Sequence, residues 1–246
     1  LHSAELDFRL EAANLTQVGA NLRRARVVAT LPEVVPALTT RRLLVMRFCE
    51  GSALKDGGAL RAAGVDCELL VSRCCEAWGV QMFTDGHFNC DPHAANVLVD
   101  SRAPALGPVP VLLDFGLCKR LSAAERLAFC GLVHGLAELD ADRLLGALRA
   151  LGFVFANDPE PFDALRGLLF AFRNTEPDAD SSRRKVRATA KEMRARSKAQ
   201  REKAKAAGET AAMPAVPGVV LFFFRTVQML QGLCTLLGVR LPFLRP

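Results

Sequence analysis

Two short stretches decide the fold: residues 87–96, which read HFNCDPHAAN, and residues 111–116, which read VLLDFG. The first combines Asn, Asp, Pro and His and therefore predicts a loop. Two short apolar segments, Val97–Val99 and Val111–Leu113, lie on either side of a Pro-rich turn and predict a β-hairpin. The periodicity of Val65–Phe83 predicts an apolar helix ahead of the loop. The order is therefore helix, polar loop, hairpin and DFG tripeptide.

Three polar residues in this arrangement have the spacing that phosphoryl transfer requires. That chemistry needs one group to orient the attacking hydroxyl and hard oxygen ligands for Mg²⁺. Protein kinases supply a catalytic-loop Asp, an Asn five positions later and the Asp of a DFG motif. Asp91, Asn96 and Asp114 fit these positions. The alternative is that both aspartates are ordinary turn-capping carboxylates, but the ordered set favours a protein-kinase-like C-terminal lobe.

The whole chain predicts an α+β, mostly helical protein with a small β-hairpin carrying DFG and with the N-lobe largely absent. Ahead of the loop we expect a helix over Ala4–Arg26 and a strand over Leu43–Phe48. After it, Ser122 and Glu125 have the spacing of a capping box. Further helices are expected over 140–151, 160–173, 182–207 and 217–238. The expected parts are an N-lobe remnant (1–48), a kinase-like C-lobe (49–180), and a basic helix with an apolar C-terminal helix packing on that lobe (181–246).

Four stretches resemble the UbiB family of atypical kinase-like proteins, also called the activity-of-bc1-complex family. They are Glu5–Asn14 for its E-x-D helix, Val45–Gly51 for its hinge, Phe88–Asn96 for its D-P-H-x-x-N loop and Leu112–Gly116 for its DFG strand. The tail around Leu221–Gly238 is also similar, and the whole looks most like plant and algal members. The resemblance spans nearly the whole chain. It implies an atypical kinase or ATPase that uses ATP and Mg²⁺.

The resemblance also implies roles for single residues around the nucleotide. Asp91 would be the catalytic aspartate. Asn96 and Asp114 would hold the metal ion that bridges the phosphates. Glu50 would lie at the hinge, beside the adenine. His93 lies inside the loop, and we interpret it as a packing or hydrogen-bonding residue rather than as an acid or base.

The first helix carries an acidic cluster to which the family assigns two roles. The resemblance implies that Glu11 pairs with an N-lobe lysine, and that Glu5 and Asp7 form an acidic motif facing an N-terminal extension. Asp7 and Glu11 lie about one turn apart on one helix face. The alternative is a solvated helix start, where the macrodipole favours acids. The first lysine of the chain is Lys55, so the sequence identifies no partner for Glu11.

Two features separate this sequence from an ordinary protein kinase. It contains no strand lysine, nucleotide loop or K-x-G-Q motif ahead of the first helix, so we expect this chain alone to be inactive or nearly so. Only Leu117–Leu121 separate Gly116 from the next predicted helix, which leaves no room for an activation segment. This favours ATP hydrolysis or small-molecule phosphorylation, which the resemblance links to prenyl-quinone lipid metabolism in a mitochondrion or plastid. The alternative is an inactive pseudokinase that binds a lipid or a protein partner.

Charge and hydropathy are both concentrated near the C-terminal end. Residues 183–205 contain eleven Lys or Arg and two Glu, a local charge of +9 in a chain of net charge +6. The rest therefore sums to −3, which argues against nucleic-acid binding by the whole fold. We interpret this segment as a solvated helix rather than a membrane-surface contact. In the apolar tail, the uncharged run Thr226–Val239 is shorter than the ~18–20 residues of a spanning helix, so we expect core packing rather than a membrane-surface position.

Eight cysteines are scattered along the chain without a CxxC pair and without Cys/His spacing suited to zinc. Cys74 and Cys75 are adjacent, which disfavours a bridge between them. The expectation is therefore buried, reduced thiols in a reducing compartment.

Overall fold

The computed structural model describes residues 7–153 and 217–242, together with the single positions 168, 172, 188, 191 and 195. Glu5, most of the basic segment 183–205 and most of the expected helices over 160–173 and 182–207 lie outside the described residues. The division into three parts stays a prediction. In chain order the elements are α1 (Phe8–Arg24), η1 (Pro36–Leu38), β1 (Ser52–Ala53), α2 (Gly57–Ala62), α3 (Cys67–Gly79), η2 (Val80–Asp85), β2 (His87–Asn89), η3 (Ala94–Asn96), β3 (Val97–Asp100), η4 (Pro104–Leu106), β4 (Val109–Leu112), β5 (Cys118–Arg120), α4 (Ala123–Glu138), α5 (Ala141–Ala150) and α8 (Gly218–Leu237).

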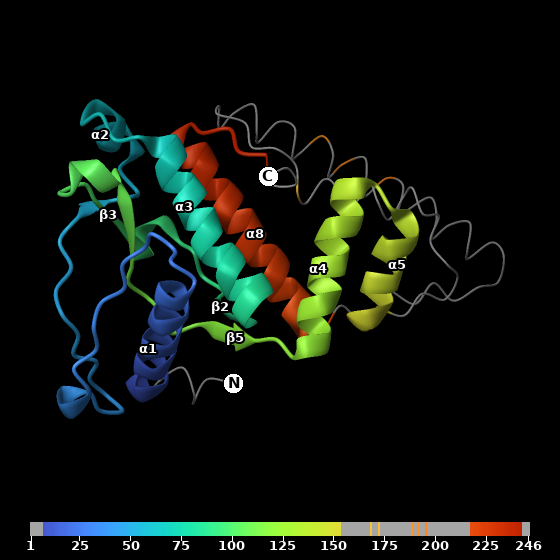
Figure 1. Ribbon diagram of the computed structural model, residues 1–246, viewed down its shortest axis with the longest axis horizontal. Coiled ribbons are helices and arrows are strands. Elements are labelled where there is room, and N and C mark those ends of the chain that lie inside the picture. The colour runs from blue at the N-terminus through green and yellow to red at the C-terminus, as the bar shows by residue number, and fades with distance from the viewer. Residues whose placement is uncertain are drawn as a thin grey trace.

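The described part is mostly helical, with two small antiparallel sheets (Figure 1). Helices α3 and α8 lie side by side through the centre, α4 and α5 form a pair on one flank, and α1 lies on the other. One sheet has the strand order β1-β3-β4 and the other pairs β2 with β5. This arrangement agrees with the predicted α+β, mostly helical class.

The predicted apolar helix over 65–83 is realised as two segments of different geometry. Asp66 caps α3 by accepting a hydrogen bond from the amide of Leu69, and α3 then continues without a break into a π-helical turn, η2. Gly86 ends that turn in the left-handed region at φ 67°, a conformation that costs glycine little. The chain can therefore reverse directly into β2 and the loop of residues 90–96.

The α4–α5 pair begins at the capping box that the sequence predicted. Ser122 accepts the amide hydrogen of Glu125, and the Glu125 carboxylate accepts the Ser122 amide hydrogen. A Cβ at Gly135 would lie 3.0 Å from the backbone nitrogen of Leu144, so the glycine permits the close approach of the two helices. The pair is therefore set by local sequence at both its start and its crossing.

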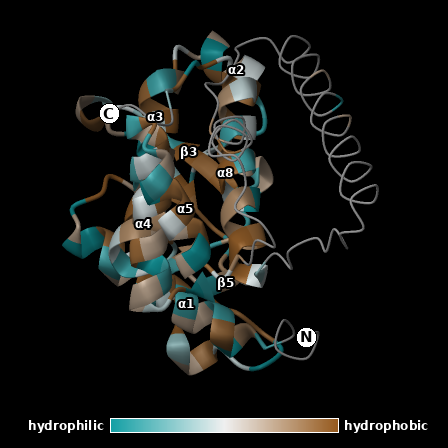
Figure 2. Ribbon diagram, turned by 90° about the vertical axis from the view of Figure 1, so that its right-hand side faces the viewer, coloured by the Kyte–Doolittle hydropathy of each residue, from teal (hydrophilic) through white to brown (hydrophobic). Residues whose placement is uncertain are grey.

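Helix α8 packs into the core, as expected for the apolar tail. Its buried side chains recur at helical spacing: Val220, Phe223, Val227, Leu230, Cys234 and Leu237. Figure 2 shows the helix coloured largely as hydrophobic. The expectation that the tail is too short to span a membrane is wrong, because α8 has 20 residues and is long and apolar enough to do so despite Arg225. Core helices of soluble proteins can be equally long and apolar, and 44% of the apolar window of α8 is buried inside the protein.

The strand expected over Leu43–Phe48 is also wrong in extent. This segment runs antiparallel to residues 33–35, with hydrogen bonds from the Val35 amide to the Val45 carbonyl and from the Arg47 amide to the Glu33 carbonyl, both 2.8 Å. The segment forms two isolated bridges, Val34 with Met46 and Thr40 with Leu43, in place of a regular strand. The pairing ends on one side where the chain enters the 3-10 helix η1 at Pro36.

All eight cysteines are free thiols, as the sequence predicts. Half of them are buried, and the others are partly exposed. Burial raises the pKa of the Cys74 thiol to about 12, so this thiol is protonated at neutral pH.

Candidate functional site

Asn96 and Asp114 meet at the end of the β3–β4 hairpin. Asn96 immediately precedes β3, Asp114 follows β4, and the Leu113 amide donates to the Asn96 carbonyl at 3.0 Å. The Asn96 side-chain amide donates to Asp114 Oδ2 at 3.3 Å. The other carboxylate oxygen of Asp114 accepts the Gly116 amide hydrogen at 2.9 Å. Strand pairing thus brings together two side chains that lie 18 residues apart.

These two side chains fit the ligand chemistry of Mg²⁺. The described residues contain no group of three or more His, Cys, Asp or Glu that could hold a metal ion. Magnesium, however, is commonly held by one or two protein ligands together with phosphate oxygens and water. The amide oxygen of Asn96 and the carboxylate of Asp114 are hard oxygen donors of this kind. The pair therefore suits a metal ion that arrives with a nucleotide.

Asp91 lies on the loop of residues 90–96 with its side chain about one-third exposed. Its amide donates to Asn89 Oδ1 at 2.7 Å, and its carboxylate forms an ion pair with Arg225 of α8 at 3.4 Å. His93 caps the short helix η3, because its Nδ1 accepts the Ala95 amide hydrogen at 3.1 Å. His93 thus makes the local hydrogen bond that we expected of it.

Asn89 is a central residue of the site that the sequence reasoning did not select. It is 3% exposed, and it sits where conventional kinases have the His of His-Arg-Asp. Its side-chain amide donates to the Asp114 carbonyl while its side-chain oxygen accepts the Asp91 amide hydrogen. Its own backbone is held by Trp78 Nε1 at 2.9 Å and by Gln81 Oε1 at 3.1 Å. One buried side chain therefore fixes the backbone at both acidic residues.

Glu11 has a partner that the sequence did not identify. Its carboxylate accepts the amide hydrogen of Phe115, inside the DFG motif, at 3.3 Å. Asn14, one turn further along α1, donates to the Phe115 carbonyl at 3.1 Å. Burial raises the pKa of Glu11, the Phe115 bond opposes that effect, and the nearby Asp114 charge adds to it. Helix α1 therefore holds both the amide and the carbonyl of the DFG phenylalanine.

Asp7, the other described member of the acidic motif, acts at the start of α1. It is the N-cap and accepts hydrogen bonds from the backbone and side chain of Arg9. The Arg9 side chain lowers the pKa of Asp7 to about 2. These contacts are typical of a solvated helix start. That Asp7 faces an N-terminal extension stays a prediction.

Glu50 lies at the rim of a cavity of about 340 Å³ beside the expected hinge. Its carboxylate forms a 2.5 Å ion pair with Arg102, which also pairs with Asp100 at 2.8 Å. Thr30, Phe48, Cys49 and Val111 are among the other lining residues. The cavity is therefore bordered by β4, the strand that leads to Asp114.

Comparison with known proteins agrees with this geometry. Residues 2–148 match the family described as ABC1 atypical kinase-like domain. The AarF domain-containing protein kinase 1 of Gallus gallus is 32% identical over 148 residues, covering 60% of this chain and 28% of the relative. The protein of the same name from Mus musculus is 29% identical over 237 residues, covering 96% and 43%. The chain thus spans less than half the length of these relatives.

A solved structure has a similar fold. It is the complex of Rv3197 with erythromycin from Mycobacterium tuberculosis, with a TM-score of 0.61 and 16% sequence identity. The match covers 98% of this chain and 56% of the other chain. At this identity the likeness shows the fold alone, and it confirms the expected kinase-like architecture.

Proposed function

This chain belongs to the family of ABC1 atypical kinase-like domains, and on that premise we propose that it binds Mg·ATP and directs its γ-phosphoryl group to water or a small acceptor. The observation that carries the proposal is the hydrogen bond of 3.3 Å between Asn96 and Asp114, which Asn89 links to the backbone of Asp91. Bound Mg²⁺ would neutralise the charge that develops on the phosphates. Asn96 and Asp114 would hold that ion.

The roles of the remaining residues follow from their positions. Asp91, partly exposed at the open side of the loop, would orient the acceptor hydroxyl or water and take its proton. Asn89 keeps the Asp91 amide and the Asp114 carbonyl in a fixed relation, because it bonds to both. The cavity beside Glu50 would take the adenine. Positioning and charge stabilisation would together supply the catalysis.

The segment that follows the DFG motif favours a small acceptor. Residues 114–123 are all described, and within them β5 pairs with β2 in the register His87 with Arg120 and Asn89 with Cys118 before α4 begins at Ala123. The segment on which protein kinases dock a peptide is therefore replaced here by a strand of the site itself. We extend the proposal to an acceptor of the prenyl-quinone class, which rests on the family resemblance.

A thermal-shift titration with Mg·ATP tests the proposal. Ligand at about 100 times its Kd stabilises a protein by about 2.7 kcal/mol, which corresponds to a rise in Tm of roughly 5–10 °C at this size. The rise should require Mg²⁺ and should be lost in Asp114→Asn. Asp142→Asn, which removes an exposed acid of α5, is the control and should keep it. No rise in the wild-type protein would refute nucleotide binding.

Turnover provides the second test. If Mg·ATP binds and is consumed, Asp91→Asn should lower kcat by about 10²–10⁴-fold, the usual contribution of a positioned base. Binding in the thermal-shift assay should be retained, because Asp91 is not one of the proposed metal ligands. Binding without any turnover in the wild-type protein would instead indicate an accessory, nucleotide-binding role.

A further inference from the structure

We infer that Arg225 is a positioning residue for Asp91, so that α8 completes the catalytic loop as well as the core. This inference rests on the proposed function, since it assigns the contact to the reacting carboxylate. Arg225 Nη2 lies 3.4 Å from Asp91 Oδ1, and the two residues are 134 positions apart in the chain. Both side chains are partly exposed, at 48% and 32%, so the pair lies at the protein surface.

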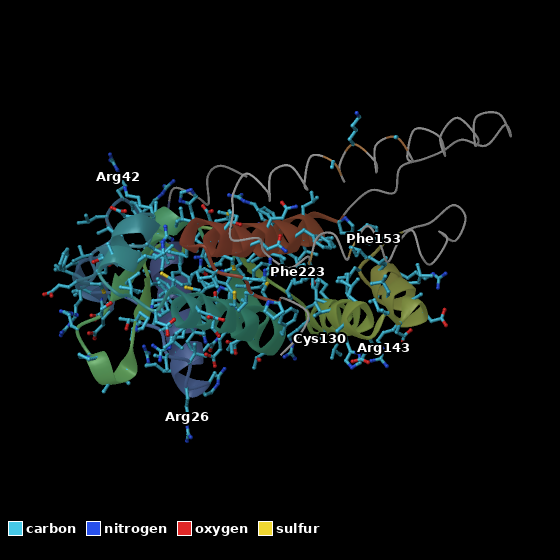
Figure 3. All side chains as sticks on the ribbon, turned by 90° about the horizontal axis from the view of Figure 1, so that it is seen from above. Arg26, Arg42, Cys130, Arg143, Phe153 and Phe223 are labelled. Atoms are coloured by element: carbon cyan, nitrogen blue, oxygen red, sulfur yellow. The ribbon has the colours of Figure 1, made fainter. Side chains whose placement is uncertain are left out.

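Helix α8 is held firmly enough to present this arginine. Phe223 stacks on Phe129 of α4 with ring centroids 4.1 Å apart, and it meets Phe83 of η2 edge-on at 6.0 Å (Figure 3, where Phe223 is labelled). Phe222 contacts β5, because the ammonium group of Lys119 lies 4.6 Å from its ring centroid. The residues just ahead of Arg225 are therefore fixed both in the core and to the strand that follows DFG.

Within residues 87–96, all of them described, the loop does not orient the Asp91 carboxylate through a cation of its own. Cys90, the residue before Asp91, is fully buried, and Pro92 follows it. The His93 ring accepts a hydrogen bond from the loop amide two residues on. The Asn89 side chain fixes the Asp91 backbone rather than its carboxylate. The carboxylate is held from outside the loop, by the Arg225 guanidinium.

A guanidinium suits this task. It carries five N–H donors in a rigid plane, and one of them is used by Asp91. Its charge keeps the carboxylate turned toward the open side of the loop without occupying the metal ligands Asn96 and Asp114. Loss of Arg225 should therefore impair phosphoryl transfer, the step after nucleotide binding. The variant should have a lower kcat and an unchanged KM for ATP.

Hydrogen–deuterium exchange of the loop tests positioning without requiring turnover. In Arg225→Gln, amides of residues 90–96 should exchange about two- to fivefold faster than in wild type, as expected for loss of a partly exposed ion pair. Arg225→Lys should restore most of the protection. Gln228→Ala, an exposed position one turn further along α8, is the control and should match wild type. Unchanged exchange in Arg225→Gln would overturn the inference.

Kinetics then separate this inference from the proposed function. With turnover, Arg225→Gln should lower kcat at constant KM, Arg225→Lys should recover it in part, and Gln228→Ala should have no effect. Faster loop exchange in Arg225→Gln with no Mg·ATP binding by wild type would keep the positioning contact and refute the proposed function. If wild type binds Mg·ATP, Asp114→Asn does not, and Arg225→Gln matches wild type in loop exchange and kcat, the proposed function would stand and the role of Arg225 would be refuted.

Discussion

His87 makes the stability of this protein depend on pH, and its surroundings define how. The ring is 3% exposed, and Nε2 lies 3.1 Å from the side-chain oxygen of Asn14. Because the Asn14 amide group donates to the Phe115 carbonyl, its oxygen must accept, and Nε2 therefore carries the ring proton. The other ring nitrogen, Nδ1, is buried without a hydrogen-bond partner among the described residues. A second proton would thus place a buried charge on a ring nitrogen without a hydrogen-bond partner among the described residues.

The size of the effect follows from the pKa. Burial, with a smaller contribution from the charge of Arg120, lowers the pKa of His87 from 6.5 to about 4. In the unfolded chain the ring binds a proton near pH 6.5, so the folded state loses stability as pH falls from 6.5 toward 4. Each unit is worth 1.36 kcal/mol, which gives about 3 kcal/mol over this window. That is a large part of a typical stability of 5–15 kcal/mol.

Urea unfolding at pH 7.0 and pH 4.5 measures this loss. His87→Gln keeps a donor for Asn14 and removes the titrating ring, so its free energy of unfolding should fall by about 2–3 kcal/mol less than that of wild type between the two pH values. His134→Gln, at an exposed position on α4, is the matched control and should lose as much as wild type. If wild type and His87→Gln lose stability in parallel, the reasoning about the buried ring is refuted.

Four further substitutions test electrostatics and packing elsewhere in the protein. Burial raises the pKa of Glu11, so the charged form that prevails above the raised pKa costs stability; Glu11→Gln should raise Tm at pH 7, and the gain should shrink toward pH 4. Phe223→Ala should lower the free energy of unfolding in urea by about 3–5 kcal/mol, because it empties a stacked core position. Gly57→Ala would bring a Cβ within 2.8 Å of the backbone oxygen of Leu236 and should lower Tm. Gly58→Ala has room for its Cβ, so it should raise the free energy of unfolding by up to about 1 kcal/mol, the difference in helix propensity, and should raise Tm. Equal Tm values for the two variants would contradict the close contact of α2 with α8.

The family and the coarse fold could be predicted from sequence, because both depend on local signals. The D-x-x-x-x-N loop, the DFG tripeptide and the Ser122 capping box are each written within a few consecutive residues. Strand pairing could be expected where apolar runs flank a turn. The expected strand over 43–48 did not form, because the segment opposite it turns into η1 at Pro36 and pairing is limited to isolated bridges. Local pattern indicates where an extended segment lies, whereas its hydrogen bonding depends on the segment opposite.

The contacts that the sequence did not reveal share a different cause. Glu11 and Asn14 reach Phe115 across more than 100 positions, and Arg225 reaches Asp91 across 134. Such contacts cannot be predicted from periodicity or motif spacing, because they form only when α1 packs against the DFG motif and α8 packs against the loop that carries Asp91. A signal was available for Asn89, since a polar residue two positions before the catalytic aspartate stands where kinases place a His.

The departure from His-Arg-Asp and the contact with α8 have one physical explanation. Cys90 occupies the Arg position and is fully buried, and burial raises the pKa of its thiol to about 12. A guanidinium placed there would be desolvated, at a cost of several kcal/mol without a partner. Position 90 therefore does not supply a cation to Asp91. Arg225 does so from α8, and this links a helix far from the catalytic loop in sequence to the geometry of the reacting carboxylate.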